Sequence, residues 1–176
     1  MTVRPIRYLG DPVLRKPARR VSRVDDSIRR LIEDMTQSMY AAHGVGIAAP
    51  QVGVPLRIVV IGMPDEEPFA LINPEVVRRS GERRLDEGCL SVPGYRGTVT
   101  RSSAVTVKAL DAQGKEIRVK AEDSLLAQCL EHETDHVNGL LYVDHLDAKT
   151  DLVKIDEATA AAADSAPAPA PADGSA

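Results

Sequence analysis

Two histidines spaced one helical turn apart, with a glutamate between them, are the residues in this sequence best suited to chemistry. His132 and His136 occupy positions i and i+4 of the run HETDH, so a helix would place both imidazoles on one face. One metal ion can then accept both rings, and Glu133 can act as general base on a water in the ion's open position. The chain has only four histidines, so this spacing favours a metal-dependent hydrolytic site over a polar helix face.

A catalytic centre of this kind needs a third protein ligand. Cys89, in the run EGCLS, is the strongest candidate, because a thiolate with two imidazoles is an accepted ligand set. Two alternatives for Cys89 remain open: a small buried apolar side chain, or a disulfide partner for Cys129. Cys129 precedes His132 by three residues and is either a fourth ligand or, as we expect, part of the wall of the site.

The elements that would position these residues follow from the hydrophobic pattern. Residues 124–141 have helical spacing, and Asn138-Gly139 is a typical C-terminal stop signal, so the histidine pair is expected inside a helix. Residues 28–42 predict an amphipathic helix. Strands are expected at 56–61, at 69–74 with a turn at its end, within 75–85, at 104–110 and at 116–121. The predicted fold class is α+β, with antiparallel sheets wrapped around the metal-binding helix.

A segment rich in small residues follows the first predicted helix. The run GVGIAAPQ at 44–51 contains two glycines, which let a ligand or a neighbouring strand approach the backbone closely. It lacks the spacing of a dinucleotide or phosphate loop. Gln51 ends this apolar run and can present its amide to a site.

Composition and charge limit the classes of function. The net charge of −4 argues against a nucleic-acid binder, and the basic clusters at 15–20 and 78–84 are expected to be solvated surface. No apolar run reaches membrane-spanning length, no signal peptide is visible, and two cysteines fit a reducing compartment, so a cytoplasmic protein is expected. We expect one catalytic domain at 1–155 and a disordered Ala/Pro-rich tail at 156–176.

Three separated motifs together resemble the peptide deformylase family: residues 44–51, 87–91 and 132–136. The run GDPVL at 10–14 is also similar to the family's N-terminus, and the resemblance covers roughly residues 1–150. One departure is Glu131, where the family commonly has Gln, and we expect it to affect the surroundings of the ligands rather than to abolish activity.

The resemblance implies removal of the N-formyl group from the initiator methionine of nascent polypeptides, possible ribosome association and Fe²⁺ as the metal, with Zn²⁺, Ni²⁺ or Co²⁺ able to substitute. Cys89, His132 and His136 would hold the ion, and Glu133 would transfer the proton. Gln51 and the backbone N–H of Leu90 would stabilise the oxyanion. The remaining implied residues are the substrate-binding Gly44, Val45, Gly46, Leu85, Leu125 and Cys129, and Asp135, which would orient a neighbour with Arg101 as its salt-bridge partner.

Two rival functions share part of this pattern. A zincin-type peptidase would take its third ligand from downstream, where Asp144 and His145 lie, but would leave Cys89 and Gln51 unexplained. A non-catalytic metal-binding module would close the site with four protein ligands, the fourth being Cys129.

Overall fold

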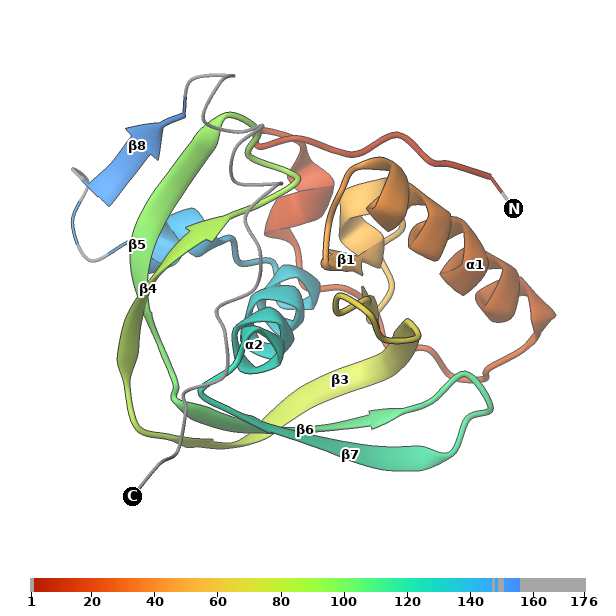
Figure 1. Ribbon diagram of the computed structural model, residues 1–176. Coiled ribbons are helices and arrows are strands. Elements are labelled where there is room, and N and C mark those ends of the chain that lie inside the picture. Colours follow the sequence, from red (N-terminus) through yellow and green to blue (C-terminus); the bar gives the residue numbers. More distant parts are fainter. Residues whose placement is uncertain (1, 147, 149–150, 156–176) are drawn as a thin grey trace.

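The computed structural model describes residues 2–146, 148 and 151–155, so the predicted tail at 156–176 lies outside the described residues. Two antiparallel sheets enclose one helix, α2 (Leu125–Val137), and a second helix, α1 (Asp26–Ala41), lies beside the larger sheet (Figure 1). The predicted α+β fold class is therefore confirmed. Neither α1 nor α2 is long and apolar enough to cross a membrane.

The larger sheet has five strands in the order β1-β2-β3-β6-β7, and the smaller has three in the order β4-β5-β8. The bounds in the larger sheet are β1 Gly46–Ala48, β2 Ile58–Ile61, β3 Phe69–Ser80, β6 Ala104–Leu110 and β7 Glu116–Glu122. Those in the smaller sheet are β4 Arg83–Gly88, β5 Tyr95–Arg101 and β8 Leu152–Lys154. Short 3-10 helices occupy Pro12–Arg15, Ala49–Val52 and Tyr142–His145.

The larger sheet separates two apolar cores. Successive side chains of strand β2 point to opposite faces of the sheet, and each face is covered by a core. The strand is therefore buried along its whole length. Val59 and Ile61 pack in the core that contains Leu130 of α2. Ile58 and Val60 pack in the core that contains Met35 of α1. This two-sided burial holds α2 firmly against the sheet.

Helix α1 begins where the sequence predicts a cap. The Asp25 carboxylate accepts hydrogen bonds from the backbone N–H groups of Ser27 and Ile28, at 2.9 and 3.1 Å. Its apolar stripe faces the second core, with Met35 and Met39 fully buried. The amphipathic helix predicted at 28–42 is confirmed within two residues at each end.

Strand β3 corrects one prediction. We expected a strand to end in a turn at Asn73-Pro74 and another to follow within 75–85, but β3 continues to Ser80. The pairing with β6 shifts register between Ile72 and Glu75, and Asn73 has a φ of 55°, so the turn residues form an irregularity inside the strand. The Asn73 amide bonds both backbone groups of Val21 across the sheet edge, which stabilises this conformation.

Three strands, of which two are very short, are not predicted by the sequence pattern. Strands β1 and β8 have three residues each, too few for alternation to be recognised. Strand β5 was unassigned, although it pairs with β4 from Arg83–Arg101 to Gly88–Arg96. Strand β1 comes from the glycine-containing run at 44–51, so a neighbouring strand, β2, does approach its backbone.

Candidate metal centre

Helix α2 brings its two histidines to one point. Ser124 caps the helix by accepting a hydrogen bond from the Ala127 N–H at 3.2 Å, and the helix ends at Val137 with Asn138 as its cap. The Nε2 atoms of His132 and His136 lie 3.2 Å apart. The His136 side chain is almost completely buried. The predicted helical placement of this pair is therefore confirmed.

Cys89 completes a three-donor group. It follows the last residue of β4, and its Sγ lies 3.3 Å from His136 Nε2. The three donor atoms all lie within 4.8 Å of one another. Nitrogen and sulfur ligands of one tetrahedral ion at ordinary bond lengths are roughly 3.3–3.6 Å apart. The spacing of these donors therefore fits a single metal ion.

The alternatives for the cysteines are resolved by the same geometry. Both cysteines are free, so a disulfide between them is wrong. Cys129 Sγ lies 3.6 Å from the carbonyl oxygen of Val45, to which it donates, and Cys129 does not belong to the three-donor group. His145 Nε2 instead lies 2.9 Å from Asp135 Oδ2.

The donors also have suitable electrostatics. Burial disfavours the Cys89 thiolate, but the neighbouring His136 and His132 outweigh it and hold the pKa of the thiol well below its usual range. The thiolate is the form of cysteine that binds metals. Burial and the adjacent Glu133 instead raise the pKa of the Cys129 thiol, which keeps it neutral.

A buried carboxylate orients His132. Glu87 Oε2 lies 2.8 Å from His132 Nδ1, leaving Nε2 directed at the donor group. Both oxygens of Glu87 accept hydrogen bonds from Arg101, at 2.8 and 3.0 Å. Such a carboxylate fixes the orientation of a ligand imidazole. Burial opposes the charge on Glu87, but His132 and Arg101 overcome it and lower its pKa to about 2.

The network continues to the far side of α2. Arg101 Nη1 donates to Asp135 Oδ2 at 2.6 Å, so the predicted ion pair between these residues is present. The Arg101 side chain is only 4% exposed, and Asp135 also contacts His145. This network thereby connects β4, β5, α2 and the last 3-10 helix behind the three-donor group.

Sequence reasoning assigned no role to Glu87 or to Ser91, although both lie in the EGCLS run. A usable signal existed for Glu87: it precedes Cys89 by two residues, and residues i and i+2 share one face of an extended chain. Ser91 accepts a hydrogen bond from Gln51 and donates its own N–H to Cys89 Sγ at 3.4 Å. The signal for His145 was weaker, because its partner Asp135 comes from another element.

Glu133 is buried beside the donors and packs against β1. An added Cβ at Gly46 would lie 2.6 Å from Glu133 Oε1 and 2.6 Å from Cys129 Sγ, so only glycine fits at this position. The other oxygen, Oε2, is buried and has no hydrogen-bond partner among the described residues. Burial raises the pKa of Glu133 to about 7, against the opposing effect of the two histidines.

The side chain of Gln51 also lies beside the three-donor group, next to Cys89. Its Oε1 accepts the Ala48 N–H at 2.8 Å, which fixes which end of the amide faces the donors. Its Nε2 donates to Ser91 Oγ at 3.1 Å and lies 3.6 Å from Cys89 Sγ. Gln51 is 1% exposed, so the amide is held rigidly with an N–H beside the cysteine.

The residues predicted to bind substrate separate into two sets. Val45 and Cys129 pack in the same core, and an added Cβ at Gly44 would lie 2.9 Å from the Leu90 side chain, so these residues surround β1 near the donors. Leu85 instead packs in the small core of Val99 and Tyr142, and Leu125 is 46% exposed at the start of α2.

Glu131, the departure noted in the sequence, points away from the donors. Its oxygens accept hydrogen bonds from Arg79 Nε at 2.8 Å and from the N–H of Ser102 at 2.8 Å. Ser102 directly follows Arg101, which contacts Glu87 and Asp135. Glu131 therefore lies next to that network, and its hydrogen bonds include none to a member of the three-donor group.

The model of the polypeptide deformylase family matches residues 3–151, nearly the whole described chain. The chain belongs to this family. It is 51% identical over 156 residues to a peptide deformylase of Dehalococcoides mccartyi strain CBDB1, covering 88% of this chain and 93% of that protein. With a peptide deformylase of Rhizobium meliloti strain 1021 it shares 48% identity, covering 87% and 91% of the two chains.

Solved deformylase structures have the same fold. The crystal structure of a peptide deformylase from Legionella pneumophila superposes with a TM-score of 0.81 at 49% identity, covering 85% of this chain and 89% of that one. The enzyme from Synechococcus elongatus in complex with actinonin gives a TM-score of 0.80 at 46% identity, covering 83% and 80%. Family membership makes this chain a metal-dependent hydrolase acting on amides.

Proposed function

We propose that this deformylase removes the formyl group from the N-terminal formylmethionine of newly made polypeptides and releases formate. The observation that carries this proposal is the joint placement of Cys89, His132 and His136 within 4.8 Å, with buried Glu133 and Gln51 beside them. The nascent chain is the partner, and the cytoplasm, near the ribosome, is where such a substrate is made.

Cys89, His132 and His136 would hold one divalent ion, which we propose to be Fe²⁺, with Zn²⁺, Ni²⁺ or Co²⁺ able to substitute because these ligand types suit all four. The ion when bound supplies Lewis acidity toward the formyl carbonyl and lowers the pKa of water. Glu87 keeps the His132 ring in position for this role through its 2.8 Å contact with Nδ1.

Glu133 is proposed as the proton carrier. Its carboxylate takes a proton from the attacking water and gives it to the leaving amine as the C–N bond breaks. Burial raises the pKa of Glu133, which makes its carboxylate a stronger base than an exposed one. The unpaired, buried Oε2 supports this role.

Gln51 and the backbone N–H of Leu90 are proposed as the oxyanion donors. The Gln51 Nε2 is already fixed beside Cys89 by Ala48 and Ser91, so it need not reorganise as negative charge develops on the formyl oxygen. Leu90 directly follows the proposed ligand Cys89, which brings its N–H into the same region.

The polypeptide is proposed to bind along residues 44–46. Among the described strands β1 pairs only with β2, so we expect its second edge to accept an extended peptide by backbone hydrogen bonds along residues 44–46, while the Ala48 N–H is already bonded to Gln51. Val45 and Cys129 line the proposed methionine pocket, and Leu85 and Leu125 would contribute at its rim. The crowding at Gly46 supports a close approach between this strand and the catalytic glutamate.

The rival functions have less support. A zincin-type site would need His145 or Asp144 as a ligand, whereas His145 contacts Asp135 and Asp144 pairs with Arg15. A closed site would need Cys129 as a fourth ligand, yet its thiol contacts Val45.

The decisive assay measures formate release from formyl-Met-Ala-Ser by the metal-loaded protein, with intact casein as control substrate. We expect formate release without casein cleavage. Casein cleavage would select the peptidase, and tight metal binding with neither activity would select the non-catalytic module.

A further inference from the structure

A cleft lined by three arginines lies behind the helix that carries His132 and His136. It has a volume of about 450 Å³ and is lined by Ala18, Arg20, Arg57, Glu75, Val76, Arg79, Thr134 and Asn138. Thr134 and Asn138 stand two residues after His132 and His136, which turns them about 200° around the helix from the ligands. The cleft is therefore separate from the metal centre.

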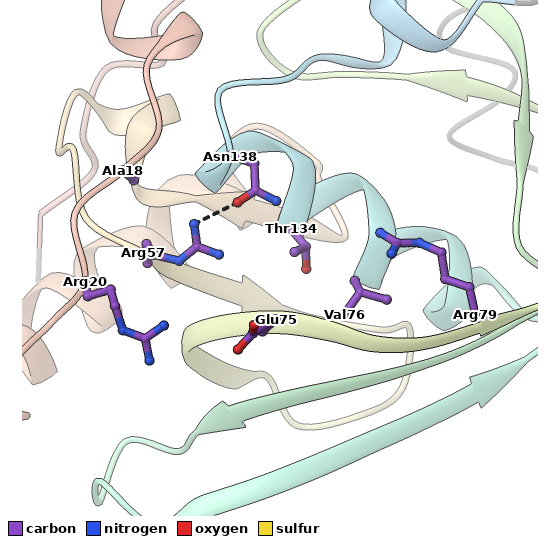
Figure 2. A pocket seen from close by; sticks show the side chains of 8 residues that line it. All are labelled: Ala18, Arg20, Arg57, Glu75, Val76, Arg79, Thr134 and Asn138. Carbon is purple, nitrogen blue, oxygen red and sulfur yellow. Dashed lines mark hydrogen bonds between the residues drawn. The ribbon is translucent and has the colours of Figure 1, made fainter.

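Three arginines line this cleft, from its two ends. Figure 2 shows Arg20 and Arg57 entering from one end and Arg79 from the other, with Thr134 between them. Arg20 comes from the basic cluster at 15–20 and Arg79 from the one at 78–84, so the fold brings one arginine from each cluster to one place. Both residues are exposed, as the prediction of solvated surface requires, and they line the same cleft.

The positive charge in the cleft is only partly neutralised. Arg79 pairs with Glu131, and Glu75 is the only carboxylate among the described residues that line the cleft. Arg57 donates only to neutral acceptors: Pro74 O at 2.7 Å, Asn138 Oδ1 at 2.8 Å and Val137 O at 3.2 Å. Within the described part of the chain, neither Arg20 nor Arg57 has a carboxylate oxygen within 4.0 Å.

The Arg57 guanidinium is held ready for an anion. Its three acceptors fix the plane of the group at the end of α2, so little side-chain freedom remains to be lost on binding. Its Nε is buried without a partner among the described residues. Burial and the nearby charge of Arg20 lower the pKa of Arg57, and the carboxylate of Glu75 opposes this effect only in part, so an anion between the two guanidinium groups would reduce the remaining repulsion.

We propose that this cleft binds a phosphate group, with Arg20 and Arg57 as its principal contacts and Arg79 as a third. Planar guanidinium groups bind phosphate oxygens through paired hydrogen bonds, and the cleft is larger than one phosphate requires. The phosphate is either that of a small free anion or that of an RNA backbone.

The test uses the metal-loaded full chain and two substitutions of equal charge change. Arg20→Glu reverses a charge inside the cleft. Arg19→Glu reverses the charge of the neighbouring residue, which is exposed and does not line the cleft. Dissociation constants for pyrophosphate and for a short single-stranded oligouridylate are measured by calorimetry at one salt concentration, and thermal unfolding checks that both variants are folded.

We expect Arg20→Glu to weaken binding about tenfold or more, and Arg19→Glu to weaken it less than about threefold. The milder Arg20→Gln should fall between them. Tighter binding of the oligouridylate than of pyrophosphate would assign the phosphate to RNA, and equal or weaker binding would assign it to a free anion. Absence of binding, or equal loss in Arg20→Glu and Arg19→Glu, would overturn the proposal; the latter would mean that the anion binds at the metal centre or without a defined site.

Discussion

Glu131 and Glu133 are two carboxylates on one helix with opposite surroundings. Both are buried, but Glu131 accepts hydrogen bonds from Arg79 and Ser102, whereas one oxygen of Glu133 has no partner among the described residues and lies beside the three-donor group. Residues two apart on a helix point about 200° away from each other, which accounts for the difference. The pair therefore offers a matched comparison between a proposed catalytic carboxylate and a structural one.

Replacing Glu133 by Gln should lower kcat for formyl-Met-Ala-Ser by about 10²–10⁴-fold, because the amide cannot accept and return a proton. Metal content should be unchanged. Glu131→Gln, which keeps the shape of a side chain that contacts only Arg79 and Ser102, should retain activity within about threefold. Near-normal turnover by the Glu133→Gln variant would show that Glu133 is not the proton carrier.

Cys89→Ala should lose stoichiometric metal, because two imidazoles alone hold a divalent ion weakly in a site built for three protein ligands. Elemental analysis of protein purified without oxygen measures this directly. Cys129→Ser is the control, since that thiol lies outside the donor group and contacts Val45. A full metal complement in Cys89→Ala would show that Cys89 is not a required ligand.

Residues close in sequence were predictable, and those joined only by the fold were not. The i, i+4 spacing of His132 and His136 determines their shared face as soon as the segment is helical. The pairing of Glu87 with His132 spans 45 positions and depends on β4 packing against α2. Cys89 could be named as a ligand candidate, but its distance to His136 required the structure.

At the level of elements, the contact between β1 and α2 brings the strand proposed to bind the peptide close to Glu133, the proposed proton carrier. A Cβ added at Gly46 would lie 2.6 Å from both Glu133 Oε1 and Cys129 Sγ. The helices were predictable from periodicity and caps, but β1 was not, because three residues carry no pattern. Strand β3 misled the prediction because Asn73-Pro74, a typical turn sequence, here forms an irregularity within one strand.

Gly46→Ala should reduce kcat about 10²-fold, because the new methyl must displace the Glu133 carboxylate, and small displacements of catalytic groups are costly. Gly88→Ala is the matched control: it also lies near the site, but its added Cβ would meet no atom closer than 3.7 Å. Rates for both variants on the same formyl peptide, with thermal unfolding as a check, decide the matter. Equal effects in the two variants would contradict steric control at β1.

The whole molecule holds its proposed metal ligands on two separate layers. Cys89 follows a strand of the smaller sheet, while His132 and His136 belong to the helix packed against the larger sheet. Arg101 already joins the two layers by contacting Glu87 of β4 and Asp135 of α2. A metal ion bound by all three ligands would add a second connection between them, so metal binding and folding should be linked.

Removal of the metal should therefore lower the melting temperature of the whole chain. At a free metal concentration a hundred times the dissociation constant, binding to the folded state alone contributes about 2.7 kcal/mol. For a domain of this size that corresponds to about 5–10 °C. Thermal unfolding with and without a chelator measures the shift, and Cys89→Ala, with its ligand set broken, should show almost none. An equal chelator effect in Cys89→Ala would place the stabilising ion somewhere other than between β4 and α2.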